Sequence, residues 1–206
     1  MKRNSAARRP LWVLKLGGSL ALSPVLQHWL RVAAELDGQV MIVPGGGPYA
    51  DAVRLAQDAC QFDDAAAHAM ALVAMEQFGR QICAMQPALV PAANPDAIVG
   101  AMADGRTPVW MAQAMVLADP GVAQDWTVTS DSLAAWLATK LQAHGLVLVK
   151  SVPTLDHDWN AMARDGVVDA AFPTAAAGLR RVHLLARDDW LALPALVQER
   201  EDACHA

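Results

Sequence analysis

The sequence L-W-V-L-K-L-G-G-S at residues 11–19 joins an apolar run directly to a pair of glycines. A short apolar run bounded by glycine predicts a buried strand of a parallel sheet. Residues 39–48, Q-V-M-I-V-P-G-G-G-P, show the same arrangement, with a strand over 39–43 and a helix from about Tyr49 to Asp58. Both segments therefore predict a strand that passes through glycines into a helix.

Strands and helices are expected to alternate along the rest of the chain. The clearest further strands are 146–150 and 182–186, and weaker candidates lie at 88–91 and 108–111. A short extended piece is expected at 127–129 and a polar loop at 153–166. Helices are expected over 19–36, 63–85 (capped by Asp63 or Asp64), 132–143, 173–179 and 188–200. This alternation predicts the α/β class: a sandwich with a mostly parallel central sheet, in one domain over residues 1–206.

Composition and charge exclude several classes of protein. With 54% apolar and 18% charged residues, the chain has material for a buried core and is not of the disordered type. A net charge of −5 argues against a nucleic-acid partner. Cys60, Cys83 and Cys204 form no C-x-x-C pair, which predicts reduced thiols and no structural zinc. No run approaches the ~18 apolar residues of a membrane helix, and the basic start lacks a secretory pattern, so we expect a cytoplasmic protein.

Glycine-rich turns follow the first two predicted strands, at 17–18 and 45–47. In open α/β sheets, ligands bind beyond the carboxyl ends of the strands. Backbone N–H groups in such turns, together with the N-terminus of the next helix, attract anions. The alternative is that these glycines serve the turn conformation alone. The P-loop, dinucleotide and hydrolase-elbow fingerprints are all absent from the sequence.

Lysine is rare in this chain, and two of its four lysines lie in apolar surroundings. Lys15 interrupts the first predicted strand, and Lys150 ends the strand at 146–150. A buried ammonium group is costly unless it meets a counter-charge. Phosphate oxygens would supply that charge, and the alternative partner is a structural carboxylate.

Asp131 is the third candidate for chemistry. It lies in T-S-D-S, residues 129–132, which on pattern alone also predicts a helix N-cap cluster. In the functional interpretation its carboxylate orients lysines or binds magnesium beside phosphates. Phosphoryl transfer needs positioning and charge neutralisation rather than covalent chemistry from the protein. Two lysines, two glycine turns and one carboxylate would be sufficient for it.

Three motifs together resemble the amino-acid kinase family in order and spacing: V-L-K-L-G-G-S (13–19), I-V-P-G-G-G-P (42–48) and T-S-D-S-L-A-A-W-L-A (129–138). The resemblance spans about residues 11–187. It implies a three-layer αβα sandwich, with an acceptor-binding lobe (about 11–115), a nucleotide-binding lobe (about 116–206), and ATP with Mg²⁺ as reactants. Lys15 would neutralise the transferring phosphoryl group and Asp131 would hold that lysine in place.

The roles that the resemblance implies cover three groups of residues. The catalytic candidates are Lys15, Asp131 and Lys150, and no direct side-chain metal ligand is assigned, although Asp131 is a candidate. The candidates for binding phosphate and ATP are Gly17, Gly18, Ser19, Gly45, Gly46, Ser151 and Val152. The candidates for binding the acceptor are Gly46, Gly47, Asp51, His68, Thr129 and Ser130.

Within the family, three segments look most like the small branch of [5-(aminomethyl)furan-3-yl]methyl phosphate kinases, in methanofuran-type cofactor biosynthesis. They are residues 67–79, 126–132 and 147–152. The implied reaction converts ATP and a phosphate monoester to ADP and a diphosphate ester. Alternatives are a carboxylate or nucleotide acceptor, and a non-catalytic binding or storage protein on the same fold. The family's late lysine is missing, since no lysine follows residue 160, and Lys150 could supply that charge.

The predicted acceptor pocket rests on few residues. His68 shares a helix face with Leu72 and Met75, and it either contacts the acceptor phosphate or is a packed or surface histidine. Asp51 could meet an ammonium group or favour the first turn of its helix. Trp126 and Trp136 could wall a furan-sized acceptor, with core or subunit packing as the stronger expectation. We expect Arg54 and Arg80 to be solvated. The apolar composition favours a homo-oligomer, with a dimer as the default.

Overall fold

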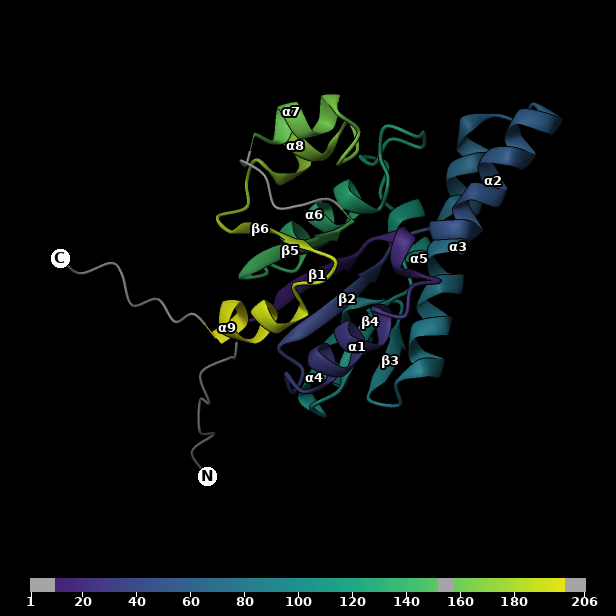
Figure 1. Cartoon of the computed structure of the whole chain (residues 1–206). Helices are drawn as coiled ribbons and strands as arrows, with labels where there is room; N and C mark the ends of the chain where they lie inside the picture. The colour runs from purple at the N-terminus through teal and green to yellow at the C-terminus, as the bar shows by residue number, and fades with distance from the viewer. Residues whose placement is uncertain (1–9, 152–157, 199–206) are drawn as a thin grey trace.

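The central sheet contains six parallel strands in the order β3-β4-β2-β1-β5-β6, in a computed structural model that describes residues 10–151 and 158–198 (Figure 1). The strands are β1 (Trp12–Leu16), β2 (Val40–Pro44), β3 (Leu89–Ala92), β4 (Thr107–Trp110), β5 (Gly145–Lys150) and β6 (Val182–Ala186). The helices are α1 (Leu26–Ala34), α2 (Gly47–Cys60), α3 (Asp64–Met85), α4 (Pro95–Ala103), α5 (Gln113–Leu117), α6 (Ser130–Lys140), α7 (Trp159–Arg164), α8 (Phe172–Ala176) and α9 (Leu193–Gln198).

Strand β1 lies in the middle of the sheet and pairs with β2 on one side and β5 on the other. All five of its residues are buried, which explains its nearly continuous apolar sequence. Side chains alternate between the two faces of a strand. Trp12, Leu14 and Leu16 therefore join one apolar cluster, with α1 and α9, whereas Val13 joins the other, with α6. By the same alternation, Lys15 faces α6.

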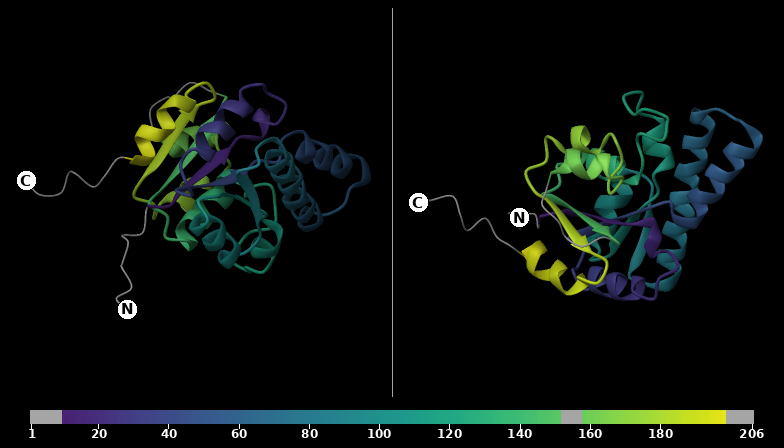
Figure 2. Two further views of the ribbon diagram at one scale, coloured as in Figure 1. Left: turned by 90° about the horizontal axis from the view of Figure 1, so that it is seen from below. Right: turned by 45° about the horizontal axis from the view of Figure 1, so that its top comes forward.

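Helices cover both faces of the sheet, and the α2–α3 pair stands out from it (Figures 1 and 2). Helix α3 begins with Asp63 as its N-cap, whose carboxylate accepts from the Ala66 N–H at 2.8 Å. Its second half packs on the sheet through Phe78 and Ile82. Its first half therefore extends toward the carboxyl ends of the strands, where ligands of parallel sheets bind. Among the described residues, no helix has both the length and the apolar character needed to cross a bilayer.

The α/β class and the mostly parallel sheet are confirmed, and several local predictions are corrected. The helix expected over 19–36 is a 3₁₀ turn at Gly18–Leu20 followed by α1. Of residues 127–129, only Thr129 has an extended backbone, because 127 and 128 lie in a turn and a bend; α7 occupies part of the expected loop at 153–166. Helices α4 and α5 were not predicted. The last helix begins at Leu193 rather than at 188, because a 3₁₀ turn at Trp190–Ala192 precedes it, and its predicted end at 200 lies outside the described residues. The division into two lobes stays a prediction, since β1 pairs directly with both β2 and β5.

Candidate active site

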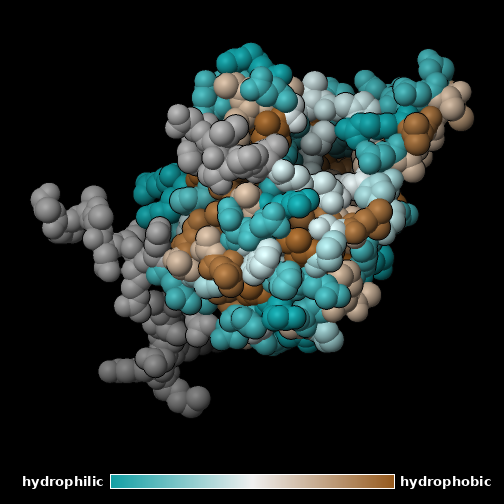
Figure 3. Space-filling view, viewed as in Figure 1, coloured by the Kyte–Doolittle hydropathy of each residue, from teal (hydrophilic) through white to brown (hydrophobic). Residues whose placement is uncertain are grey.

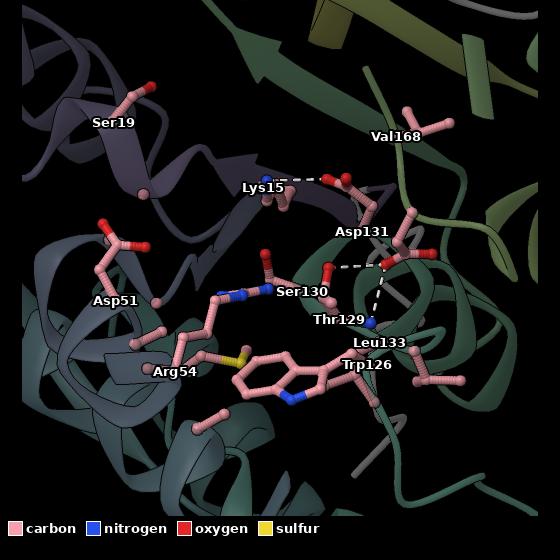
Figure 4. A pocket seen from close by; sticks show the side chains of 18 of the residues that line it. Lys15, Ser19, Asp51, Arg54, Trp126, Thr129, Ser130, Asp131, Leu133 and Val168 are labelled. Carbon is pink, nitrogen blue, oxygen red and sulfur yellow. Dashed lines mark hydrogen bonds and ion pairs between the residues drawn. The ribbon is translucent and has the colours of Figure 1, made fainter. Parts of the chain in front are cut away.

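Two lysines and one aspartate meet at the carboxyl ends of β1 and β5, and Figure 4 shows the contact between Lys15 and Asp131. The Lys15 Nζ lies 2.7 Å from Asp131 Oδ1, and the Lys150 Nζ lies 2.5 Å from Asp131 Oδ2. Asp131 belongs to the first turn of α6, and both strands direct their lysines toward that turn. Lys15 and Asp131 are each only 3% exposed. The structure thus brings together all three predicted catalytic residues.

The contacts between Lys15, Lys150 and Asp131 determine the protonation states of these groups. Burial alone would raise the pKa of Asp131, but the adjacent Lys15 and Lys150 ammonium groups outweigh it and keep that pKa below its usual range. Burial, assisted by Lys15, lowers the pKa of Lys150 to about 8, against the raising effects of Asp131 and Asp169. Two ammonium groups share one carboxylate, so an anion from solution would relieve an excess of positive charge.

The contacts of Asp131 bear on its candidate role as a magnesium ligand. Each of its two carboxylate oxygens is in contact with an ammonium group. Among residues 10–151 and 158–198, no group of three or more His, Cys, Asp or Glu side chains is placed to hold a metal. A direct magnesium contact by Asp131 stays a prediction, as does the expectation that Mg²⁺ is held by the nucleotide phosphates.

The two glycine turns lie directly against each other. Gly47 has a left-handed φ of 52°, and a Cβ on it would lie 2.6 Å from the Gly18 carbonyl oxygen. A side chain at Gly18 would likewise strike the Gly47 backbone. Both turns need glycine because only a bare backbone permits this approach. The turn conformation itself is thus one reason for the glycines, as the alternative interpretation of the sequence proposed.

Only part of the glycine set can offer N–H groups to a ligand. The Gly17 N–H donates to the Val149 carbonyl at 3.2 Å, and the Gly45 N–H donates to the Leu16 carbonyl at 2.9 Å. The predicted role of these two N–H groups as phosphate donors is therefore corrected. Gly18, Gly46 and Gly47 do line the cleft. Helix α2 begins at Gly47, and the first N–H groups of a helix have no carbonyl partner within it.

Two serines join the first glycine turn to the end of β5. The Ser19 and Ser151 hydroxyl oxygens lie 2.8 Å apart. Ser19 also lines the cleft. Val152, the last predicted phosphate-binding residue, lies outside the described residues.

The lysine cluster forms the floor of a cleft of about 760 Å³. The space-filling view shows a hollow between the α7–α8 region and the α2–α3 pair (Figure 3). On the α2–α3 side the cleft is lined by Pro48, Asp51, Arg54, His68, Leu72 and Met75. On the other side it is lined by Trp126, Thr129, Ser130 and the segment 166–170. All the predicted acceptor residues thus face one space.

His68 is the most distinctive side chain on the acceptor side. It is 4% exposed, and within the described part of the chain its Nε2 has no hydrogen-bond partner. Burial lowers the pKa of His68, against the raising effects of Asp125. At neutral pH the ring is therefore uncharged, with a buried nitrogen that a ligand could satisfy.

Arg54 is exposed, as predicted, and its side chain also lines the cleft. Its guanidinium lies 3.8 Å from the centre of the Trp126 ring and extends toward Ser130 (Figure 4). The Trp126 Nε1 donates to the Gln57 side chain at 2.7 Å, which fixes the ring against α2. Trp126 therefore forms a wall of the cleft, which was one of the two alternatives considered for it. Trp136 does not, because it stacks on Trp110 with ring centres 5.9 Å apart.

Asp169 is the main site residue that sequence reasoning missed. Its carboxylate accepts hydrogen bonds from the Thr129 N–H and hydroxyl at 2.9 and 2.8 Å, and from the Ser132 N–H at 3.0 Å. The Ser132 hydroxyl donates to its other oxygen. The cap of α6 is thus supplied from the loop between α7 and α8, not by the local T-S-D-S pattern. No local signal in the sequence around Asp169 indicates this.

Comparisons with known proteins agree with this architecture. The chain is 22% identical over 142 residues to the [5-(aminomethyl)furan-3-yl]methyl phosphate kinase of Methanocaldococcus jannaschii, a match over 68% of this chain and 65% of that relative's length. The uridylate kinase of Archaeoglobus fulgidus superposes with a TM-score of 0.66 and 15% identity, over 89% of this chain and 94% of that one. The UMP kinase of Ureaplasma parvum gives 0.65 and 14%, over 94% and 97%.

The likeness to these solved structures shows the fold alone, because the identities are low. A sequence model of the family gives the stronger result. It matches residues 10–161, which include Lys15, the glycine turns, Asp131 and Lys150. This match covers well over half of the chain, and the protein therefore belongs to the amino acid kinase family.

Proposed function

We propose that this protein is an ATP-dependent kinase that transfers a phosphoryl group to the phosphate of a small phosphate monoester. The observation that carries the proposal is the pair of lysines, Lys15 and Lys150, held on the single carboxylate of Asp131 at the floor of the cleft. With two ammonium groups on one carboxylate, one positive charge is left without a counter-charge. The second ammonium, beside a wide opening and two glycine turns, suits a polyanion.

The residues would share the work of the reaction. ATP with Mg²⁺ supplies the transferred phosphoryl group. Lys15 and Lys150 neutralise charge on its oxygens, and Asp131 keeps both lysines aimed at one point. Gly18, Gly46 and the start of α2 offer N–H groups to further phosphate oxygens. No general base is required, because a phosphate monoester oxygen is already ionised near neutral pH.

The acceptor that we propose is [5-(aminomethyl)furan-3-yl]methyl phosphate, the compound in the relative's name. Arg54 offers a cation for the acceptor phosphate, and neutral His68 offers a buried polar nitrogen. Trp126 presents an aromatic wall for a flat ring, and the exposed Asp51 carboxylate could meet the ammonium group. The pathway, a homo-oligomeric state, a cytoplasmic location and the absence of nucleic-acid partners remain expectations from sequence.

An ADP-release assay with a panel of acceptors tests this proposal. The panel contains the aminomethylfuran phosphate, simple alkyl phosphates, UMP and amino-acid carboxylates, each with Mg-ATP. We expect ADP with the aminomethylfuran phosphate and little or none with UMP or the carboxylates. We also expect Lys15→Ala to abolish turnover while the melting curve stays cooperative. Near-normal turnover by Lys15→Ala would remove Lys15 from the mechanism. ATP binding without ADP from any acceptor would instead favour a non-catalytic binding protein.

A further inference from the structure

The carboxylate of Asp169 fastens the loop before α8 to the first turn of α6. It accepts from the backbone and hydroxyl of both Thr129 and Ser132, and the three bonds of ordinary length measure 2.8 to 3.0 Å. The Ala171 N–H adds a second tie, donating to the Thr127 carbonyl at 3.1 Å. One short loop segment thereby fixes the backbone on both sides of Asp131.

This position gives Asp169 control over the direction of Asp131. Thr129 and Ser132 bracket Asp131 in the chain, and their N–H groups are held by one oxygen of Asp169. The Asp131 side chain is then free to turn away from the helix end and contact the two lysines. Without Asp169, the exposed N–H groups at the start of α6 would compete for the Asp131 carboxylate, as such groups do at helix N-termini.

Asp169 also makes the N-terminus of α6 a poor binding site for an anion. A negative charge at a helix N-terminus is stabilised by the unpaired N–H groups and the helix dipole. Because Asp169 already occupies the start of α6, that helix end offers little to a phosphate. The charge of Asp169 additionally raises the pKa of Lys150, opposing the effect of burial. Asp169 therefore supports the protonated lysine that the proposed reaction needs.

We propose that Asp169 is a positioning residue for phosphoryl transfer, acting through Asp131 by holding the first turn of α6. This inference rests on the proposed kinase function. The competing interpretation is a cap that stabilises the fold and has no influence on the lysines. The two differ in what they predict for the chemical step and for Lys150.

The kinetic test compares Asp169→Asn, Asp169→Ala and Asp169→Glu with the unchanged protein. We expect kcat to fall about 10- to 100-fold in the Asn and Ala variants, with KM for ATP changed less than about threefold, because misplaced reacting groups slow the chemical step. Asp169→Glu keeps the charge and should recover part of the rate. Asp165→Asn is the matched control, since Asp165 is an exposed carboxylate in the same segment. It should leave kcat unchanged.

A second readout needs no turnover at all. The chain has four lysines, so selective ¹³C labelling of lysine gives four side-chain signals whose pH titration can be followed by NMR. In Asp169→Asn, we expect the titration of Lys150 to move to lower pH by roughly half a unit or more, because a supporting negative charge is lost. Asp165→Asn should leave it in place.

The outcomes separate the two proposals. If the unchanged protein releases no ADP with any acceptor, the kinase assignment fails, and the NMR titration still decides whether Asp169 controls the lysine cluster. If Asp169→Asn lowers only the melting temperature, with kcat and the Lys150 titration unchanged, Asp169 is a structural cap and the positioning role is wrong. An equal shift in Asp165→Asn would also overturn it, because the effect would then be a general one of charge.

Discussion

Replacing Asp131 by asparagine should destabilise the fold strongly, because it leaves two buried ammonium groups without their shared counter-charge. Lys15 and Asp131 have side chains that are 4% exposed, and the Lys150 side chain is 15% exposed, so solvent can replace little of the lost interaction. Removing one partner of a buried ion pair costs about 3–5 kcal/mol. For a chain of this length, that loss corresponds to a fall in melting temperature of roughly 6–20 °C.

The loss in Asp131→Asn should shrink as the pH rises from 7 to 9. Lys150 has a folded pKa of about 8 against an unfolded value of 10.5, so its depressed pKa makes stability rise with pH between these values. Without the Asp131 carboxylate, the folded pKa of Lys150 falls further. The rise of stability with pH therefore begins at a lower pH in Asp131→Asn than in the unchanged protein. Asp131 itself stays ionised throughout this range and adds no pH dependence.

Thermal and urea unfolding of the two proteins at pH 7 and pH 9 provides the assay. Asp188→Asn is the control, because it breaks the exposed ion pair between Arg187 and Asp188 and should leave the stability nearly unchanged. Adding Lys150→Met to Asp131→Asn removes one of the two repelling cations and should recover part of the loss. If Asp131→Asn were as stable as the unchanged protein at pH 7, or equally destabilised at both pH values, the proposed charge balance would be refuted.

Three further predictions concern the cleft. Lys150 must be protonated to neutralise phosphate, so kcat/KM for ATP should fall as the pH rises through about 8. Lys150→Arg, whose charge does not titrate in this range, should remove that fall. If the fall in kcat/KM were the same in Lys150→Arg, Lys150 would not be the titrating group. Gly47→Ala places a side chain on a left-handed backbone against Gly18 and should cost about 1–3 kcal/mol of stability. Gly178→Ala, whose new Cβ meets no atom within 4 Å, should leave the stability unchanged. Similar melting curves for the two variants would contradict the close contact between the glycine turns. In steady-state kinetics, His68→Ala should raise KM for the acceptor about tenfold and leave KM for ATP unchanged. Equal effects on both KM values would place His68 outside the acceptor site.

Strands were predicted well where a buried parallel strand leaves a continuous apolar signal. The strand predicted at 182–186 matches β6 at both ends, and β1, β2 and β5 differ from their predictions by about one residue. Helix α3 was readable because Asp63 caps it and Pro87 follows it. Helices α5 and α7 were missed because they are only five and six residues long, and so short a segment shows no clear periodicity.

The candidate site was partly readable for a different reason. Lysines at the ends of apolar strands had to meet at one edge of the sheet, and Asp131 at a helix start had to be near them. Sequence could not show which glycine N–H groups are used within the backbone, as those of Gly17 and Gly45 are. Nor could it show that the α6 cap comes from Asp169, because that contact joins positions 37 and 40 residues apart and depends on tertiary structure.

The proposed mechanism requires Lys15 and Lys150 to receive the nucleotide phosphates. The most direct measurement is the addition of Mg-ATP to ¹³C-lysine-labelled protein, with the side-chain signals of all four lysines followed across pH. We expect saturable shifts at Lys15 and Lys150, a rise in the Lys150 pKa above about 8, and little change at Lys140. Bound Mg-ATP that left both cleft lysines unmoved would contradict the account.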